Sequence, residues 1–433
     1  MAEPPGRAEG GPAGKAARAF EAASQATPQR PEAGSSGVPI ATIRTPCVRG
    51  LGTSITPRRR AMFRHALLLA AVLSLVPSAY AAGPSVDARA YLVEDGRTGE
   101  VLLGGNPARQ VPVASLTKMM TVLLALEGTQ LSDLVTVSPE AAEVGESSVN
   151  LRAGEQLTVR DLVEACLIQS ANDAAWALAD HVGRGSESRF VAMMNRRARQ
   201  LGLSETHFVR PDGLDAAGHV SSARDMTMLA RVLMRRSVVR QIVAMTDATI
   251  AGGRHLHTWN DLLGTYPGVV GVKTGHTTTA GWSEVAAVRG SGVTVYVTVL
   301  GSPDRSTRNG DLIELMTWGL SRFRVVSVIS ADRSYARPET SYGRGELSLV
   351  AARSQRRAVL VGRPLVERVV APVGVELPVS KGEKLGEVRV YDRHRLIASS
   401  PLVASRSISK PGTIGRAGWY VGRTAHNMWG WVG

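Results

Sequence analysis

Apolar residues follow strand-like spacing in some parts of the chain and helix-like spacing in others. Between residues 90 and 103, two short apolar runs flank Asp95 and Gly96, which predicts two strands joined by a turn. Helical spacing then dominates as far as residue 234, after which strands are predicted at 269–273, 283–288 and 293–300 and a helix at 312–320. Strands at both ends of a helical middle predict an α+β domain whose antiparallel sheet is covered by helices.

The helical middle divides into five predicted helices. Thr158 and Asp161 form a capping box before the second helix, and Gly202 stops the fourth. The five segments are residues 115–127, 162–169, 172–181, 189–201 and 222–234. Residues 289–292 are predicted to join the last two strands as a hairpin.

From about residue 323 the pattern changes to short alternating strands, at 358–361, 375–379 and 386–391. This predicts a small β-sandwich-like domain over residues 323–410, after a first domain over 83–322. The tail, 411–433, combines Trp419 and Tyr420 with arginines. It is either a frayed terminus or an amphipathic segment at a membrane surface, where indole rings lie at head-group depth. Its glycines weigh against a stable helix.

The first 81 residues are predicted to lie outside the folded protein. Residues 1–61 are rich in Pro, Gly, Ala and Arg, a composition typical of a disordered leader. A second methionine, Met62, is followed by basic residues, an apolar stretch at 66–76, and small residues around Ala81. This pattern is typical of a signal peptide over 62–81, so we expect an exported protein, periplasmic or at the outer face of the cytoplasmic membrane.

Charge and cysteine content narrow the possible partners. The net charge is +14, but residues 1–81 hold ten basic and four acidic residues, so +8 remains after their removal. Such a basic surface suits anionic wall polymers and lipid head groups, whereas the low aromatic content of 5% makes nucleic acid a poor candidate. Only Cys166 remains beyond the signal segment, so no internal disulfide can form, and its apolar helical surroundings predict a core residue.

The candidate nucleophile is Ser115, at the predicted start of a helix. Lys118 follows three residues later, and this spacing places both side chains on one helix face. Serine is too weakly acidic to attack a carbonyl at neutral pH without a base, and a neutral lysine can take its proton. Ser170 and Asn172 lie between two predicted helices and bring a second hydroxyl and an amide to a shared cleft.

A third motif, residues 273–276, is predicted to end a strand. Lys273 supplies a cation and Thr274 a hydroxyl, while Gly275 lets a substrate backbone lie against the strand edge. Each motif alone is a weak signal. Three of them in this order, each at the end of an element, indicate serine acyl transfer much more strongly.

Lysine usage supports the same chemistry. The chain has six lysines against 45 arginines, and between residues 83 and 322 Lys118 and Lys273 are its two lysines. Arginine does not lose its proton in proteins, whereas a buried lysine shifts its pKa readily. Lysine therefore remains at the two positions where the mechanism needs an amine, although a structural ion-pair role is the alternative.

With these motifs the sequence resembles the low-molecular-mass penicillin-binding proteins that act as D-alanyl-D-alanine carboxypeptidases. The likeness covers roughly residues 90–322 and includes the segments 114–121, 169–174, 212–214, 221–226 and 317–319. It implies a β-lactamase/transpeptidase-like α+β fold followed by a small all-β domain. One departure is Ala171, where the family usually has glycine, and the extra methyl is expected to affect rate more than reaction type.

The resemblance also implies roles for individual residues. Ser115 would attack the carbonyl between two terminal D-alanines of a peptidoglycan stem peptide, with Lys118 as base. Ser170 and Lys273 would pass a proton to the departing D-alanine. Asn172 would hold the substrate amide. The backbone N–H groups of Ser115 and His276 would bind the oxyanion. Thr274, with Gly275 beside it, and an arginine would receive the terminal carboxylate. By its spacing to Trp318 that arginine is Arg308, expected in the turn after strand 293–300; a surface arginine without a role is the alternative. β-Lactams would act as inhibitors.

Other functions remain open from the sequence. A serine β-lactamase uses the same three motifs but needs a glutamate that activates water, and Glu140, Glu143 and Glu146 precede the second motif instead of following it. An endopeptidase that cuts wall crosslinks and a non-catalytic wall-binding protein are the further alternatives. The nine histidines show no metal-ligand spacing, and no cofactor is expected.

Overall fold

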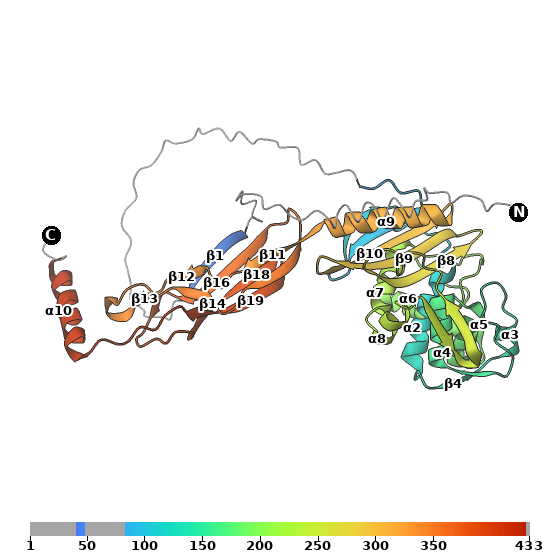
Figure 1. Ribbon diagram of the computed structural model, residues 1–433, viewed down its shortest axis with the longest axis horizontal. Coiled ribbons are helices and arrows are strands. Elements are labelled where there is room, and N and C mark those ends of the chain that lie inside the picture. The colour runs from blue at the N-terminus through green and yellow to red at the C-terminus, as the bar shows by residue number, and fades with distance from the viewer. Residues whose placement is uncertain (1–39, 48–82, 430–433) are drawn as a thin grey trace, which may run out of the picture. The chain divides into compact units, whose positions relative to one another are not determined.

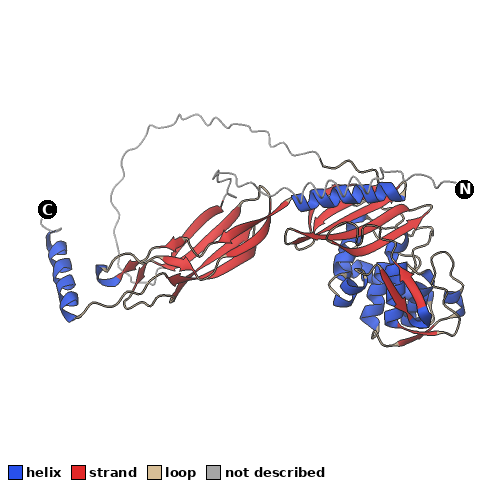
Figure 2. Cartoon of the chain, viewed as in Figure 1, coloured by secondary structure: helices blue, strands red, loops and turns tan. Residues whose placement is uncertain are grey.

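The computed structural model describes residues 40–47 and 83–429, which form two compact units (Figure 1). The first unit contains residues 83–323, and the second contains residues from 324 onward together with strand β1 (Ile40–Cys47). Helices gather in the first unit, and strands make up most of the second (Figure 2). The expected fold class, an α+β domain followed by an all-β domain, is confirmed. The predicted signal peptide, 62–81, lies outside the described residues.

A five-stranded antiparallel sheet forms the frame of the first unit, in the order β3-β2-β10-β9-β8. Ser291 and Gly292 join β9 to β10, and both have positive φ, as a tight two-residue hairpin requires. Strand β8 is an edge strand, so one side of it is not paired with another strand of the sheet. The strands are β2 (Ala90–Asp95), β3 (Glu100–Gly105), β8 (Val269–Thr277), β9 (Gly281–Gly290) and β10 (Val293–Ser302).

Helices cover both faces of this sheet. Helix α9 (Arg305–Ser321) packs on β9 and β10, and α7 (Ala223–Leu233) packs on β2 and β10 from the other face (Figure 1). The apolar core continues from α7 into a helical region around α2 and α5. The other helices of this unit are α2 (Lys118–Gly128), α3 (Pro139–Ala142), α4 (Val159–Glu164), α5 (Asn172–Gly183), α6 (Glu187–Leu201) and α8 (Ser237–Ile242). Two small hairpins pair β4 (Leu134–Thr136) with β5 (Gln156–Thr158) and β6 (Asp247–Ile250) with β7 (Arg254–His257).

Local sequence signals explain most helix ends. The capping box of Thr158 and Asp161 is confirmed at α4, and Gly202 ends α6 in the left-handed conformation. Helix α9 begins seven residues before the predicted start, because the Asp304 side chain accepts a hydrogen bond from the Thr307 N–H and caps it there. The predicted helix 115–127 begins as a 3-10 turn over residues 114–117, and residues 165–169 form a π-helical turn.

The second unit is built on a six-stranded sheet, in the order β1-β16-β18-β19-β14-β12. Apolar side chains of its alternating strands form a separate core. Two further strand pairs, β11–β15 and β13–β17, complete it. The strands are β11 (Phe323–Ile329), β12 (Ser334–Ala336), β13 (Glu339–Thr340), β14 (Leu349–Ala351), β15 (Gln355–Leu360), β16 (Leu365–Pro372), β17 (Gly374–Val375), β18 (Lys384–Asp392) and β19 (Arg395–Ala404).

The two ends of the chain differ from the sequence prediction. Within the segment predicted to be a disordered leader, β1 pairs in parallel with β16, whose edge it covers. In the tail, α10 (Thr413–Trp429) is helical despite its glycines. Its Trp419 and Tyr420 rings pack edge to face with Tyr342, and this apolar contact opposes the low helix propensity of the glycines. Among the described helices, none combines the length and apolar character needed to span a bilayer.

Candidate active site

The Lys118 amine lies at the centre of a buried hydrogen-bond network. Ser115 is in the 3-10 turn and Lys118 is the first residue of α2, so the turn presents both side chains to the same space. Lys118 is 0% exposed. Its Nζ lies 2.7 Å from Ser115 Oγ, 2.7 Å from Asn172 Oδ1 and 2.8 Å from the Asp212 backbone oxygen.

These three contacts determine where the amine can accept a proton. The Asp212 carbonyl only accepts, and Asn172 Oδ1 also accepts because the other end of that amide, Nδ2, donates to the Gly145 oxygen at 2.9 Å. A neutral amine has two N–H donors and one lone pair. Because two acceptors take both donors, the lone pair faces the Ser115 hydroxyl, which then donates to Lys118.

The surroundings also favour the neutral amine. Burial lowers the pKa of Lys118 to about 8, although the nearby Asp212 carboxylate opposes this shift. The Asp212 carboxylate does not contact Lys118 directly. It accepts hydrogen bonds from Arg210 Nε and Nη2 and from Trp176 Nε1. Asp212 thus fixes the carbonyl that faces Lys118 while its own charge is balanced by Arg210.

Ser170 and Lys273 form a second hydroxyl–amine pair. Ser170 lies between the π-helical turn and α5 with φ 65°, a left-handed conformation in which it is held by Lys273 Nζ, 2.8 Å from its Oγ. Lys273 also donates to the Thr274 oxygen at 2.7 Å. Burial, reinforced by the charge of Lys118, lowers the pKa of Lys273 well below its ordinary value. Both amines therefore give up a proton more readily than an exposed lysine does.

Ala171 fits the loop without strain. Its φ of −61° and ψ of 124° are ordinary for alanine, and its methyl group is fully buried. We therefore expect Ala171→Gly to lower the free energy of unfolding by about 1 kcal/mol, because glycine adds backbone freedom to the unfolded chain and removes a buried methyl group. Denaturant unfolding measures this. Unchanged or higher stability in the variant would show that the methyl group strains the loop.

The third motif lies at the C-terminal end of a strand as predicted, and β8 continues through it to Thr277, four residues beyond the predicted end of the strand. A Cβ on Gly275 would lie 3.0 Å from the Ser115 nitrogen and 3.1 Å from the Val113 oxygen. Glycine therefore allows β8 to approach the turn that carries Ser115, a packing reason that the sequence did not reveal. The cleft beside it has a volume of about 270 Å³ and is lined by Ser115, Glu146, Ser147, Ser170, Trp259, Thr274, Gly275, His276, Trp282 and Arg308.

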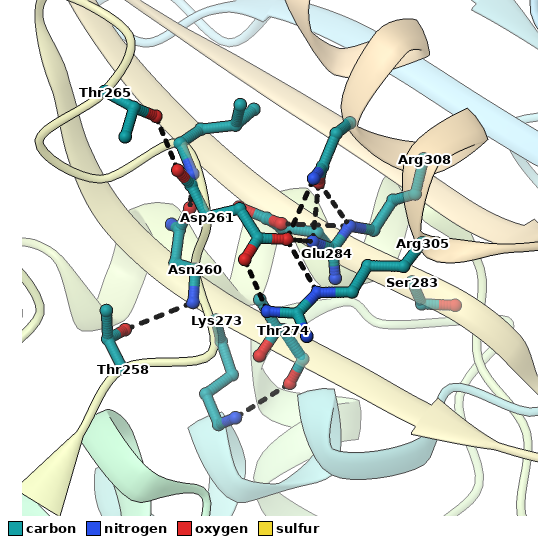
Figure 3. Close-up of polar contacts among 12 residues, drawn as sticks. Thr258, Asn260, Asp261, Thr265, Lys273, Thr274, Ser283, Glu284, Arg305 and Arg308 are labelled. Carbon is teal, nitrogen blue, oxygen red and sulfur yellow. Dashed lines mark hydrogen bonds and ion pairs between the residues drawn. The ribbon is translucent and has the colours of Figure 1, made fainter. Parts of the chain in front are cut away.

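Arg308 lies elsewhere than the sequence predicted, and it is buried. It lies in the first turn of α9, not in a turn before a helix, because Asp304 starts the helix early. It is also 1% exposed, which removes the surface alternative. Arg308 Nη2 donates to Asp261 at 3.1 Å (Figure 3) and to Asn309 at 2.6 Å. Its guanidinium carbon lies 5.7 Å from the centre of the Trp282 ring.

Several residues of this site were not selected from the sequence. His219 accepts a hydrogen bond at Nδ1 from the Val209 N–H, so its Nε2 carries a proton and donates to Thr117 Oγ1, 2.7 Å away. Thr117 in turn donates to the Ala114 oxygen and thereby holds the Ser115 turn. Asp212 could have been selected from the sequence, because it begins segment 212–214, which resembles the family. No feature of the sequence pointed to Glu284. Within the part of the chain that the structure describes, no three His, Cys, Asp or Glu side chains form a metal-binding group.

The three motifs therefore meet at one cleft. Ser115 contacts Lys118, Ser170 contacts Lys273, and both serines line the same cavity with Thr274 and Arg308. Asn172 is held by its neighbours and, in this structure, positions Lys118.

Cys166 lies in the core as expected, and burial raises the pKa of its thiol to about 12, so it is not a nucleophile.

The sequence of the chain is similar to a known protein family and to several of its members. The family model described as D-alanyl-D-alanine carboxypeptidase matches residues 78–304. The chain is 32% identical to D-alanyl-D-alanine carboxypeptidase DacC of Escherichia coli, over 82% of this chain and 94% of that protein. It is 31% identical to DacD of Salmonella typhimurium, over 84% of this chain and 98% of that protein.

A solved structure agrees with the sequence comparison. Penicillin binding protein 5 from Haemophilus influenzae superposes with a TM-score of 0.55 and 28% identity, covering 76% of this chain and 99% of that one. The similarity therefore extends beyond the first unit, since residues 83–323 make up little more than half of the chain.

Proposed function

Because the chain belongs to the family of D-alanyl-D-alanine carboxypeptidases, we propose that it removes the terminal D-alanine from peptidoglycan stem pentapeptides through an acyl-enzyme on Ser115. One observation carries the assignment of the nucleophile. The Nζ of the buried Lys118 lies 2.7 Å from Ser115 Oγ, with its other two contacts made to acceptors. This arrangement supports Lys118 as the base.

In the proposed acylation step, Ser115 Oγ attacks the carbonyl carbon between the two D-alanines and its proton passes to Lys118 Nζ. The backbone N–H groups of Ser115 and His276 bind the oxyanion, where each donor is typically worth about 3 kcal/mol. Gly275 supports this role, because its missing side chain lets β8 lie close to the Ser115 turn.

The departing D-alanine needs a proton and a place for its carboxylate. Ser170, held by Lys273, is the proposed donor to the amine, and Thr274 and Arg308 are the proposed carboxylate site. Arg308 uses Nε and Nη2 in its hydrogen bonds to described residues, which leaves Nη1 for the substrate. Asn172 holds Lys118 and meets the substrate amide by exchanging its bond to the Gly145 oxygen. Water then hydrolyses the acyl-enzyme.

A serine β-lactamase is the second candidate, because Glu146 lines the cleft although it precedes the second motif. We expect slow release of the penicilloyl group, since Glu146 precedes the second motif, whereas a water-activating glutamate would follow it. Rapid turnover of nitrocefin would favour the β-lactamase. Turnover of a crosslinked dimer in preference to a pentapeptide would favour an endopeptidase.

Two measurements test the proposal together. D-Alanine release from a pentapeptide tests the reaction, and mass spectrometry after penicillin treatment locates the adduct, which we expect on Ser115. The Ser115→Ala variant is the matched control for adduct formation. A correctly folded enzyme that releases no D-alanine and forms no adduct would instead support the wall-binding alternative.

The proposed base makes the rate depend on pH. Below about pH 8 Lys118 is protonated and cannot accept the Ser115 proton, whereas above it the amine is neutral. At saturating pentapeptide we therefore expect kcat to rise by about tenfold per pH unit below this value and to level off above it. Steady-state kinetics measure the profile. A kcat that does not change between about pH 6 and 9 would contradict Lys118 as the base.

We further propose that the protein is exported through the signal peptide at 62–81 and acts in the periplasm or at the outer face of the cytoplasmic membrane. The tail, 411–433, is the proposed membrane contact. Helix α10 supports this, because it exposes Tyr420 and Val421 on its surface. The substrate, a peptide of the cell wall, lies in the same compartment.

A further inference from the structure

A buried carboxylate stands behind the proposed carboxylate-binding arginine. Glu284 on β9 pairs with Thr274 across the sheet and is 0% exposed (Figure 3). Its Oε2 lies 3.4 Å from Arg308 Nε, and neither of its oxygens accepts a hydrogen bond from any described residue. A buried carboxylate without hydrogen bonds is costly when it is charged, so this group has a reason to hold a proton.

The guanidinium groups and carboxylates around Glu284 balance in charge only when Glu284 is ionised. From α9, Arg305 and Arg308 face it, and Asp261 lies between these two arginines (Figure 3). Lys273 faces it from β8, and burial lowers the pKa of its amine well below the ordinary value. Two guanidinium groups against Asp261 and an ionised Glu284 carry no net charge. With Glu284 protonated, the same cluster carries one net positive charge, which attracts a substrate carboxylate.

We propose that Glu284 is a positioning residue that controls, through gain or loss of its proton, how strongly Arg308 binds the terminal carboxylate of the substrate. When protonated, Glu284 leaves the charge of Arg308 available to the cleft. When ionised, it draws the guanidinium toward β9 and adds a negative charge beside the site. This inference rests on the proposed function, because it takes Arg308 as the carboxylate-binding residue.

The direction of the pH effect follows from the site. Burial raises the pKa of Glu284 to about 7, although the charge of Arg308 opposes the shift. Carboxylate binding is therefore strong below about pH 7 and weakens as the pH rises above it. The effect runs opposite to that of Lys118, whose deprotonation raises kcat over the neighbouring range. The enzyme would thus bind best and react fastest at different pH values.

The test separates binding from turnover and uses the full chain. In a Ser115→Ala background, calorimetry gives the Kd of acyl-D-alanyl-D-alanine and of its C-terminal amide, which lacks the negative charge, between about pH 6 and 8. For the acid, we expect Kd to rise by about tenfold over this range, as a single ionisation near its midpoint predicts. For the amide, Kd should stay constant. In Glu284→Gln, which keeps the shape and removes the charge, Kd of the acid should also stay constant.

The outcomes are distinguishable. Two results would show that Glu284 does not control Arg308. One is that Kd of the acid depends on pH in Glu284→Gln as it does in the Ser115→Ala protein. The other is that Kd of the acid and Kd of the amide depend on pH in the same way in the Ser115→Ala protein. The second comparison needs no change at Glu284 and remains decisive if that variant does not fold. Failure of the proposed function would instead appear as absent D-alanine release and absent penicillin adduct in the unmodified enzyme.

Discussion

Lys118→Arg is expected to lose D-alanine release as completely as Ser115→Ala, with kcat reduced by about 10⁴-fold. The guanidinium group does not lose its proton in proteins, so it cannot accept the Ser115 proton. It is also larger and planar, and it would have to enter a fully buried site between Asn172 and the Asp212 carbonyl. Single-turnover acylation by penicillin measures the effect directly, because this step requires the base.

The chain supplies a matched control for this substitution. Lys384 is exposed in the second unit, and Lys384→Arg makes the same chemical change where no proton transfer is proposed. It should retain full activity. Retained D-alanine release in Lys118→Arg, with thermal stability close to that of the parent, would mean that another group is the base.

Lys273→Arg is expected to lower kcat by about 10³-fold through a different step. Lys273 holds Ser170 Oγ at 2.8 Å and lies in a site that favours a neutral amine. A permanent positive charge there would hold Lys118 further toward its neutral form, yet it would remove the proton relay to the departing D-alanine. Opening of the β-lactam ring also leaves an amine nitrogen that takes up a proton, so acylation by penicillin should fall together with peptide turnover. Unchanged acylation by penicillin in Lys273→Arg, with thermal stability close to that of the unmodified enzyme, would contradict the relay.

Fold class and most helix boundaries were predictable because their signals are local. Thr158, Asp161 and Gly202 act on neighbouring backbone groups, and the structure shows them at the expected helix ends. Asp304 was available as a cap for α9, but the predicted start rested on apolar spacing, which begins only at residue 312. The strand within the leader and the helicity of the tail depend on partners distant in sequence, β16 and Tyr342, so local patterns could not reveal them.

For the site, the sequence indicated which residue types the chemistry needs but not how they are supported. Ser115, Lys118, Ser170 and Lys273 stand out because serine and lysine at this spacing can exchange a proton. Glu284 does not, because its position opposite Thr274 depends on the register between β8 and β9. Gly275 was selected because glycine lets a substrate backbone approach the strand. In the structure, a Cβ at this position would press against the turn that carries Ser115, and this contact depends on tertiary packing.

The burial of Lys118 and Lys273 has a practical consequence. Both are almost fully inaccessible, at 0% and 2%, so residues 83–322 offer no surface ammonium group to a reagent. Once residues 1–81, and with them Lys15, are removed on export as proposed, amine-directed coupling to a sensor chip or a fluorophore would therefore use Lys381, Lys384, Lys410 or the α-amino group. Molecules attached in this way should keep the cleft accessible to antibiotics in a binding assay.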